Sequence, residues 1–170
     1  MNAIGSPVSE NTILTILCGG GFLFETKCLM AQIGRRGSFT FLSTLYGGTP
    51  GSDGVPYGPE ARICSFSTVT DGSVLKSWKA CWSAFSGTFR ILRQSQVQSV
   101  MVVGAAYAVP MLLAARLRGR KAVFVESITR VDKLSVTGLI VYHSRLASLF
   151  VIQWPDLQQR YRRSRLGSIL

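Results

Sequence analysis

The feature that most constrains the fold is the order of three short segments near the start of the chain. Thr12–Leu17 is a run of apolar and β-branched residues, which is typical of a buried strand. Gly19, Gly20 and Gly21 follow it, and residues 22–33 have the composition of a helix. A strand, a glycine turn and a helix in this order form the opening unit of a doubly wound sheet.

The rest of the chain continues this alternation. Further strands are expected at 38–45, 61–69, 100–103, 122–125 and 149–153, and helices at 73–94, 110–118 and 136–147. Strands that alternate with helices predict an α/β fold with a Rossmann-like parallel sheet. No segment after residue 153 is long enough for another strand and helix. We therefore expect a flexible leader at 1–10, one domain at 11–153 and a basic tail at 154–170.

Positive charge is concentrated in the second half of the chain. The net charge is +11, and residues 85–170 carry thirteen basic and three acidic side chains. Fourteen of the nineteen cations are Arg, which suits bidentate contact with phosphate or carboxylate. This composition predicts a phosphate-bearing partner, which is a nucleic acid, an anionic lipid headgroup or a pyrophosphate-linked substrate.

Neither a signal peptide nor a membrane span is predicted. No Lys or Arg precedes Lys27, and Glu10 lies where a signal peptide needs positive charge. The longest apolar stretch, 100–115, is shorter than the roughly 20 residues that cross a bilayer. The four cysteines form no CxxC pair, which favours reduced thiols and a cytoplasmic protein.

Ligands of such sheets bind at the carboxyl ends of the strands. The segments expected at this edge are 19–21, 46–59, 70–71, 104–107 and 126–130. The glycines at 19–21 either let backbone amides approach a phosphate or sugar, or serve only as a tight turn. They do not match the dinucleotide-binding glycine pattern, and no metal cluster or hydrolase triad can be assembled. We expect no cofactor and no metal.

Three segments resemble one known family. They are 123–131 (VFVESITRV), 134–138 (LSVTG) and 150–157 (FVIQWPDL). Together they are similar to the asparagine-linked glycosylation protein fourteen family and to its bacterial exopolysaccharide relatives of the PssD/EpsF type. Gly20, Gly21 and Glu25 also fit the N-terminal glycine motif of this family, although Phe22 stands where relatives usually carry His.

The resemblance implies the N-terminal half of a GT-B glycosyltransferase that lies peripherally on the cytoplasmic membrane face. It further implies a small partner subunit that supplies the nucleotide-sugar site, so that this chain alone would be inactive. The pair would move a sugar from a nucleotide diphosphate donor to a lipid-diphosphate-linked saccharide. The predicted substrate-binding residues are Gly19, Gly20, Gly21, Glu25, Tyr107, Ser127, Thr129 and Arg130.

Glu126 is the candidate general base, because it ends a predicted strand beside Arg130 and an attacking sugar hydroxyl must lose a proton. The alternative is a structural ion pair between these two residues. Asp53 and Asp71 are weaker candidates for the base. Glu25 either caps its helix or binds a sugar hydroxyl. His143, the chain's single histidine, is interpreted as a packed or surface residue.

An aromatic stripe is predicted on the helix at 73–94. Trp78, Trp82, Phe85 and Phe89 recur at helical spacing, with Lys79 and Arg90 near them. One interpretation is a helix on an anionic membrane surface, with aromatic side chains at the level of the headgroups. The other is a core face packed on the sheet.

The end of the chain is the predicted docking surface for the partner subunit. The residues assigned to it are Gln153, Trp154, Pro155, Tyr161, Leu166 and Leu170. Aromatic and apolar anchors among arginines are typical of interface hot spots. The rival interpretation is a disordered tail whose arginines contact anionic lipid. For the whole chain, the alternatives are a basic nucleic-acid-binding α/β module, which lacks a recognisable binding motif, and a purely structural membrane anchor.

Overall fold

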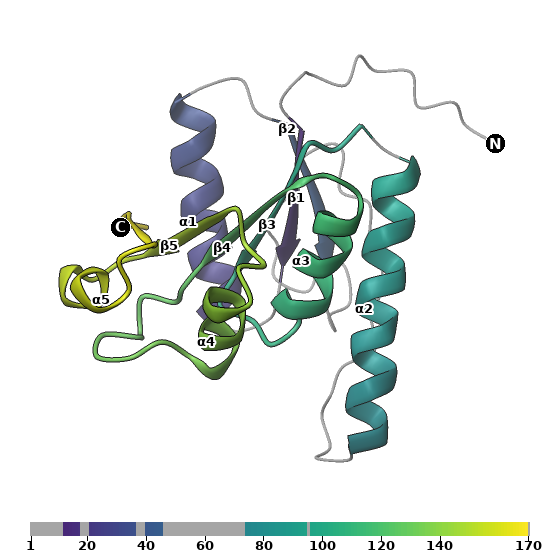
Figure 1. The fold of residues 1–170 in the computed structure, drawn as a ribbon. Helices are drawn as coiled ribbons and strands as arrows, with labels where there is room; N and C mark the ends of the chain where they lie inside the picture. Colours follow the sequence, from purple (N-terminus) through teal and green to yellow (C-terminus); the bar gives the residue numbers. More distant parts are fainter. Residues whose placement is uncertain (1–11, 18–20, 37–39, 46–73, 95, 170) are drawn as a thin grey trace.

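The structure is a computed structural model, and it describes residues 12–17, 21–36, 40–45, 74–94 and 96–169 (Figure 1). The elements in chain order are β1 (Thr12–Leu17), α1 (Gly21–Arg36), β2 (Thr40–Leu45), α2 (Val74–Gln94), β3 (Ser99–Val103), α3 (Ala108–Leu117), β4 (Lys121–Val125), α4 (Val136–His143), β5 (Leu149–Ile152), α5 (Pro155–Arg160) and β6 (Arg165–Leu166). The strand expected at 61–69 lies outside the described residues.

The described strands form one sheet in the order β2-β1-β3-β4-β5-β6, and every neighbouring pair is parallel. The chain goes from β1 to β2 on one side and later returns to β3 on the other side of β1. The point between β1 and β3 is therefore the topological switch point, where ligands of open α/β sheets bind. The predicted Rossmann-like parallel fold is confirmed.

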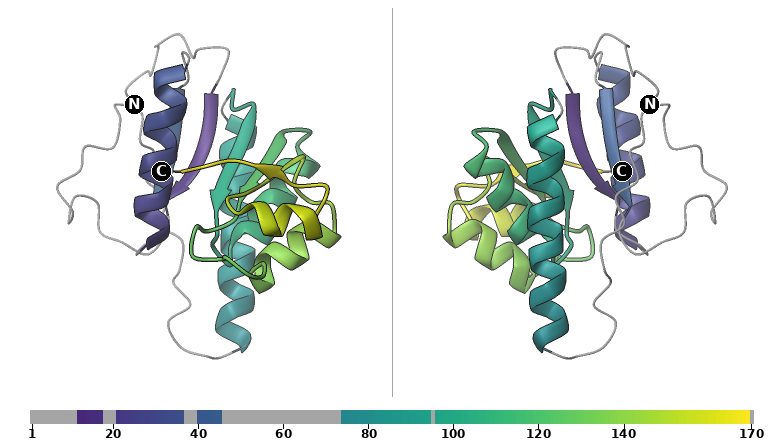
Figure 2. Two further views of the ribbon diagram at one scale, coloured as in Figure 1. Left: turned by 90° about the vertical axis from the view of Figure 1, so that its left-hand side faces the viewer. Right: turned by 90° about the vertical axis from the view of Figure 1, so that its right-hand side faces the viewer.

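Helices cover the two faces of the sheet unequally. Figure 2 shows α1 on one side of the sheet, and α2, α3 and α4 on the other. The larger core lies under α2, α3 and α4 and includes Leu14, Val102 and Phe124, which are all fully buried. A smaller core around Val103 and Val125 packs against side chains of α1. Both faces carry apolar side chains, as expected of a parallel sheet.

Two expectations about the second half of the chain are corrected. The helix expected at 136–147 ends at His143, because Arg145 adopts a left-handed backbone with φ 53°. The end of the chain is folded as well, since α5 follows β5 and the two-residue strand β6 pairs with β5. Ile169, beyond β6, is buried against the smaller core.

No helix in the described part of the chain is long and apolar enough to cross a membrane.

Candidate functional site

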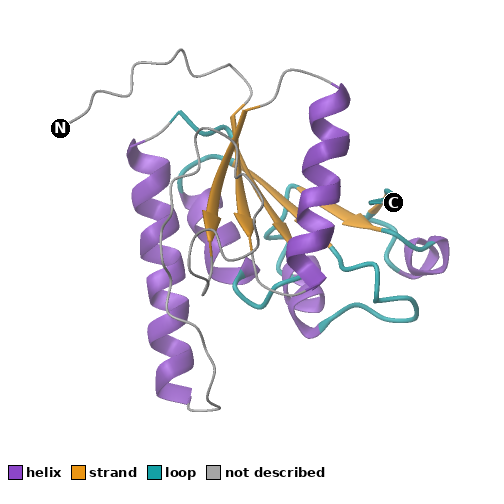
Figure 3. Cartoon of the chain, turned by 180° about the vertical axis from the view of Figure 1, so that it is seen from behind, coloured by secondary structure: helices purple, strands orange, loops and turns teal. Residues whose placement is uncertain are grey.

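The predicted ligand-binding edge exists as one end of the sheet. Figure 3 shows the arrowheads of the central strands pointing to the same side. At this edge α1 begins with Gly21 after β1, residues 104–107 connect β3 to α3, and residues 126–135 connect β4 to α4. We call this the ligand edge. The segment 126–135 contains parts of two of the three family-like segments.

Glu126 directly follows β4, and its side chain is buried, with 1% of its surface exposed. One carboxylate oxygen, Oε2, accepts hydrogen bonds from the backbone N–H and the hydroxyl of Ser135, both at 3.0 Å. The other oxygen accepts from the backbone N–H of Ser127 at 3.2 Å. Ser135 is the N-cap of α4 and in turn accepts from the N–H of Gly138 at 2.9 Å. Glu126 therefore ties both ends of the 126–135 loop together.

Burial dominates the acidity of Glu126. Removal from water raises the pKa of its carboxyl group above the ordinary value of 4.5, because the charged form is disfavoured there. The hydrogen bonds from Ser135 and Ser127 lower the pKa and offset part of this effect, and the charge of Arg130 lowers it least. The side chain of Arg130 is exposed. The predicted ion pair between the two residues is therefore not what holds this loop.

Glu25 is a second buried carboxylate at the same edge, with 5% of its surface exposed. It accepts a hydrogen bond from the Ser127 hydroxyl at 2.6 Å and one from the backbone N–H of Ile128 at 3.2 Å. Glu25 lies beyond the first turn of α1, so it does not cap that helix. Two carboxylates from distant parts of the chain thus hold the segment Ser127–Ile128 in place.

The segment after β5 completes this support. The side-chain amide of Gln153 donates to the Glu126 carbonyl at 2.9 Å, and the indole N–H of Trp154 donates to the Ile128 carbonyl at 2.7 Å. Gln153 also accepts from the backbone N–H of Ile169 at 3.3 Å. The two family-like segments, E-S-x-T-R-V and Q-W-P, are therefore parts of one hydrogen-bonded structure. The polar groups of Gln153 and Trp154 bind inside the domain, both side chains are half-buried, and their assignment to a docking surface stays a prediction.

Phe22 packs between the start of α1 and the residue that follows β3, at the switch point of the sheet. It lies in the first turn of α1, and its ring packs against Gly104, which follows β3 with φ +62°. A Cβ atom at Gly104 would overlap that ring, so both the backbone conformation and the close approach require glycine. Phe22, the departure from the resembled glycine motif, is thus a ring that packs on the core.

The remaining predicted substrate-binding residues differ in accessibility. Thr129 and Arg130 are exposed on the held loop, and Gly21 is exposed at the start of α1. Ser127 is buried, and Tyr107 is half-buried at the N-cap of α3. The others, Gly19, Gly20 and the alternative bases Asp53 and Asp71, lie outside the described residues. Of the described residues in this set, Thr129, Arg130 and Gly21 are therefore the ones most accessible to a ligand.

The aromatic stripe of α2 faces away from the core at its N-terminal end. Trp78 and Trp82 are 75% and 70% exposed, and Lys79 beside them is exposed as well. Ala84 and Leu92 lie on the other side of the helix and belong to the main core. Figure 1 shows that the N-terminal half of α2 extends past the carboxyl ends of the central strands. For these two tryptophans, the core-packing interpretation is wrong.

Phe85 and Phe89 continue the stripe toward the body of the protein. Their rings stack at 5.8 Å, and Phe85 stacks on Trp82 at 5.7 Å. Both phenylalanines are half-buried, and Arg118 of the segment after α3 lies over the Phe89 ring at 5.1 Å. The stripe is thus a continuous aromatic surface whose outer end is the more exposed.

The other predicted docking residues are divided between core and surface. Tyr161 is half-buried and packs against the main core. Pro155 is exposed, and Leu166 in β6 is 47% exposed. Leu170 lies outside the described residues. His143 is exposed at the end of α4, in agreement with its interpretation as a packed or surface residue.

Comparison with protein families identifies the relationship. A family model described as "Oligosaccharide biosynthesis protein Alg14 like" matches residues 61–170. The chain belongs to the Alg14-like family. The Eremothecium gossypii relative described as UDP-N-acetylglucosamine transferase subunit ALG14 is 35% identical over 120 residues, which cover 66% of this chain and 53% of the relative. The Homo sapiens protein of the same description is 35% identical over 83 residues, which cover 45% and 38%.

Solved structures share the fold at low sequence identity. A MurG structure from Acinetobacter baumannii matches with a TM-score of 0.59 and 21% identity, over 86% of this chain and 42% of that one. A UDP-GlcNAc 2-epimerase from Methanocaldococcus jannaschii matches with a TM-score of 0.66 and 11% identity, over 89% and 42%. This chain therefore spans about half or less of these proteins and of the curated relatives it matches. It corresponds to one lobe of a GT-B-like fold.

Proposed function

We propose that this chain is the acceptor-binding, partner-recruiting subunit of a two-chain glycosyltransferase. The complete enzyme would transfer a sugar from UDP-N-acetylglucosamine to a lipid-diphosphate-linked saccharide during oligosaccharide or polysaccharide assembly. Family membership carries this proposal, because the relatives are described as subunits of a UDP-N-acetylglucosamine transferase. The one-lobe fold supports it, since a GT-B active site lies between two lobes.

The ligand edge supplies the acceptor site in this proposal. Thr129 and Arg130 are exposed on a loop whose other residues donate hydrogen bonds to the buried carboxylates of Glu25 and Glu126. A guanidinium binds the oxygens of a diphosphate through directed N–H donors, and a hydroxyl suits a sugar. Because the backbone of this loop is fixed before the ligand arrives, less ordering of the loop accompanies binding.

Glu126 is assigned a positioning role instead of the role of general base. A general base must come within hydrogen-bond reach of the hydroxyl that it deprotonates. The Glu126 carboxylate is 1% exposed, and both of its oxygens already accept hydrogen bonds from Ser127 and Ser135. Its contribution to transfer is to fix the loop that carries Thr129 and Arg130.

The aromatic stripe is the proposed membrane contact. Trp78 and Trp82 lie at the end of α2 that extends past the ligand edge, so a bilayer touching them would also be close to the acceptor site. Aromatic rings at headgroup level and the cation of Lys79 suit an anionic, peripheral contact. In this proposal, the membrane contact holds a lipid-linked acceptor near Thr129 and Arg130. We propose the cytoplasmic face as the site of this contact.

Reconstitution tests the proposal. The purified chain should transfer no sugar from UDP-N-acetylglucosamine to a lipid-diphosphate-linked acceptor, because it supplies one lobe only. Addition of a donor-binding subunit, identified by co-purification from native membranes, should produce transfer. Turnover by the purified chain alone would refute the split-enzyme proposal. Substitution of Arg130 by Gln in the assembled complex should raise the KM for the acceptor, and an unchanged KM would refute the acceptor site.

A further inference from the structure

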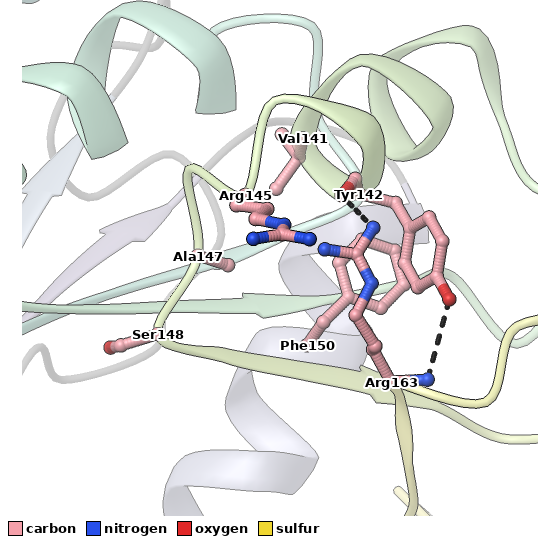
Figure 4. Close-up of a pocket in the computed structure, with 7 residues that line it drawn as sticks. All are labelled: Val141, Tyr142, Arg145, Ala147, Ser148, Phe150 and Arg163. Carbon is pink, nitrogen blue, oxygen red and sulfur yellow. Dashed lines mark hydrogen bonds between the residues drawn. The ribbon is translucent and has the colours of Figure 1, made fainter.

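A cavity of about 410 Å³ lies between the end of α4, the start of β5 and the segment that joins α5 to β6. In Figure 4 the guanidinium groups of Arg145 and Arg163 point toward each other across it. Val141, Ala147 and Phe150 supply apolar walls. A few charged groups placed against apolar walls are typical of a site for a molecule that carries an anionic group.

This cavity is separate from the ligand edge. Ser148 lines the cavity and immediately precedes β5, whereas Glu126 immediately follows β4. Since β4 and β5 are parallel neighbours, the residue before one strand and the residue after the other lie at opposite ends of the sheet. The cavity therefore has no part in the acceptor site proposed above.

Arg163 is fixed in place by Tyr142. A guanidinium nitrogen donates to the Tyr142 carbonyl at 2.9 Å, and the guanidinium carbon lies 4.4 Å from the centre of the Tyr142 ring. The backbone N–H of Arg163 donates to the Tyr142 hydroxyl at 3.3 Å. A guanidinium has five N–H donors, so one hydrogen bond and one ring contact orient the group and leave donors for a ligand.

Arg145 occupies a backbone position where glycine is usual. Its N–H donates to the Tyr142 carbonyl at 3.3 Å, and the next N–H, of Leu146, donates to the Val141 carbonyl at 3.1 Å. These two bonds form a Schellman motif that ends α4, and the left-handed residue in it is usually Gly, because a side chain is disfavoured there. Arg145 has this conformation, with φ 53°. An arginine at a position that favours glycine indicates a use for its side chain.

The two guanidinium groups face each other without a carboxylate between them. None of the residues that line the cavity is acidic, and within the described residues neither arginine forms a salt bridge. Like charges held close together repel, and a bound anion relieves that repulsion. The planar guanidinium matches the oxygens of a phosphate group. We propose that Arg145 and Arg163 form a binding subsite for a phosphate group carried on a larger molecule.

A purely structural role for these arginines leads to a different expectation. Cations are favourable near the C-terminus of a helix, and both residues lie close to the end of α4. If this were their whole role, removal of the Arg145 side chain would leave phosphate binding unchanged. Under the proposal, Arg145→Gly weakens binding while the fold becomes as stable or more stable, since glycine suits the left-handed backbone.

The experiment uses the full chain and two probes. Calorimetric titration with inorganic pyrophosphate measures binding of a free phosphate compound. Sedimentation with phosphatidylcholine vesicles that contain phosphatidic acid measures binding of a lipid headgroup. If the natural ligand is a free phosphate compound, Arg145→Gly should weaken binding of pyrophosphate by about tenfold or more; if it is a lipid headgroup, the same loss should appear with the vesicles. In both cases the Tm should be unchanged or higher. Arg162→Gln removes the same charge from an exposed neighbour outside the cavity and should change binding by roughly twofold at most.

Three outcomes would overturn the proposal. The first is binding of both probes by Arg145→Gly as tightly as by the unmodified chain. The second is an equal loss of binding in Arg145→Gly and Arg162→Gln, which would indicate general charge attraction. The third is no binding of either probe by the unmodified chain. Arg145→Asn also tolerates a left-handed backbone and should reproduce the result of Arg145→Gly, which excludes an effect of added backbone freedom.

Discussion

Gly138 shows how closely the loop after β4 fits the helix that follows it. A Cβ atom at this position would overlap the Oε2 atom of Glu126 and lie 3.1 Å from the hydroxyl of Ser135. We predict that Gly138→Ala lowers the free energy of unfolding by about 1–3 kcal/mol in urea denaturation. Gly34→Ala in α1 is the control, since nothing lies within 4 Å of its Cβ and a helix favours Ala. Equal stability of Gly138→Ala and the unmodified chain would contradict this close fit.

The pKa of Glu126 predicts a pH dependence of stability. Burial raises this pKa in the folded state above 4.5, so the folded chain keeps the proton at pH values where the unfolded chain has lost it. The stability that Glu126 contributes is therefore fully present below pH 4.5 and declines as the pH rises through the folded pKa. Urea unfolding of the unmodified chain and Glu126→Gln from pH 4 upward measures this. The advantage of the unmodified chain should shrink with rising pH, and a growing advantage would contradict the assigned direction.

At the level of residues, the sequence predicted the location of the important side chains better than it predicted their roles. Glu126 was predicted at the ligand edge and Glu25 was predicted as a substrate-binding or helix-capping residue, and the structure brings both to that edge. Their roles depend on partners that spacing does not indicate. The Ser127 hydroxyl reaches a carboxylate 102 positions away in the chain, and the Trp154 indole supports a carbonyl 26 positions away. One of these partners can be predicted from the sequence, because a serine before an apolar run, such as Ser135, is a typical helix N-cap.

Among the elements, α2 leads to the clearest prediction. Replacement of Trp78 and Trp82 together by Ala should leave the Tm nearly unchanged, because both side chains are largely exposed. The same variant should bind vesicles of phosphatidylcholine and phosphatidylserine at least about tenfold more weakly, since burying one large apolar side chain contributes about 1.5–3 kcal/mol. Co-sedimentation at low and high salt measures both the aromatic and the charge contributions.

A matched control for this stripe is Leu117→Ala. Leu117 is 63% exposed at the end of α3 and lies outside the stripe. Its replacement should leave vesicle binding unchanged. If the Trp78 and Trp82 variant binds vesicles as well as the Leu117 variant does, then the stripe is not the membrane contact. A large fall in Tm for the tryptophan variant would instead show that the indoles stabilise the fold.

Element boundaries were predictable where apolar periodicity is strong and less so where tertiary contacts decide. The prediction for α2 agrees with the structure to within a residue, because its buried and exposed faces are well separated in sequence. Residues 144–147 have helix-like composition, yet the Schellman motif at Arg145 ends α4 before them. The strand β6 is two residues long and pairs only with β5, so periodicity does not reveal it.

For the whole molecule, the order of elements was the most informative part of the sequence. Alternating strands and helices allow few topologies, because crossovers between parallel strands are right-handed. The sheet order and its switch point follow from this rule once β1 and β3 are neighbours. The parallel pairing of β4 and β5 places Glu126 and the cavity beside Arg145 at opposite ends of the sheet, so the two sites that we propose for anionic ligands are separate.

The folded end of the chain changes how partner docking must be tested. Deleting residues 166–170 would remove part of β6 together with Ile169, which is buried and accepts a hydrogen bond from Gln32 at 2.7 Å. Such a truncation would damage the lobe itself. Leu166 is a better target, because it is 47% exposed at the edge of the sheet. We propose that the second lobe joins at this edge.

We therefore predict that Leu166→Arg reduces co-purification of the donor-binding subunit by about tenfold or more, because hot-spot truncations cost upward of about 2 kcal/mol and a buried unpaired charge costs more. The variant chain should keep its Tm and its binding to anionic vesicles. Leu117→Arg introduces the same charge at an exposed leucine of α3 and should leave the subunit bound. Full stoichiometry of the partner with Leu166→Arg would exclude this edge from the joint. Equal losses in both variants would show that added charge disturbs the assembly in general, and the docking assignment would then be wrong.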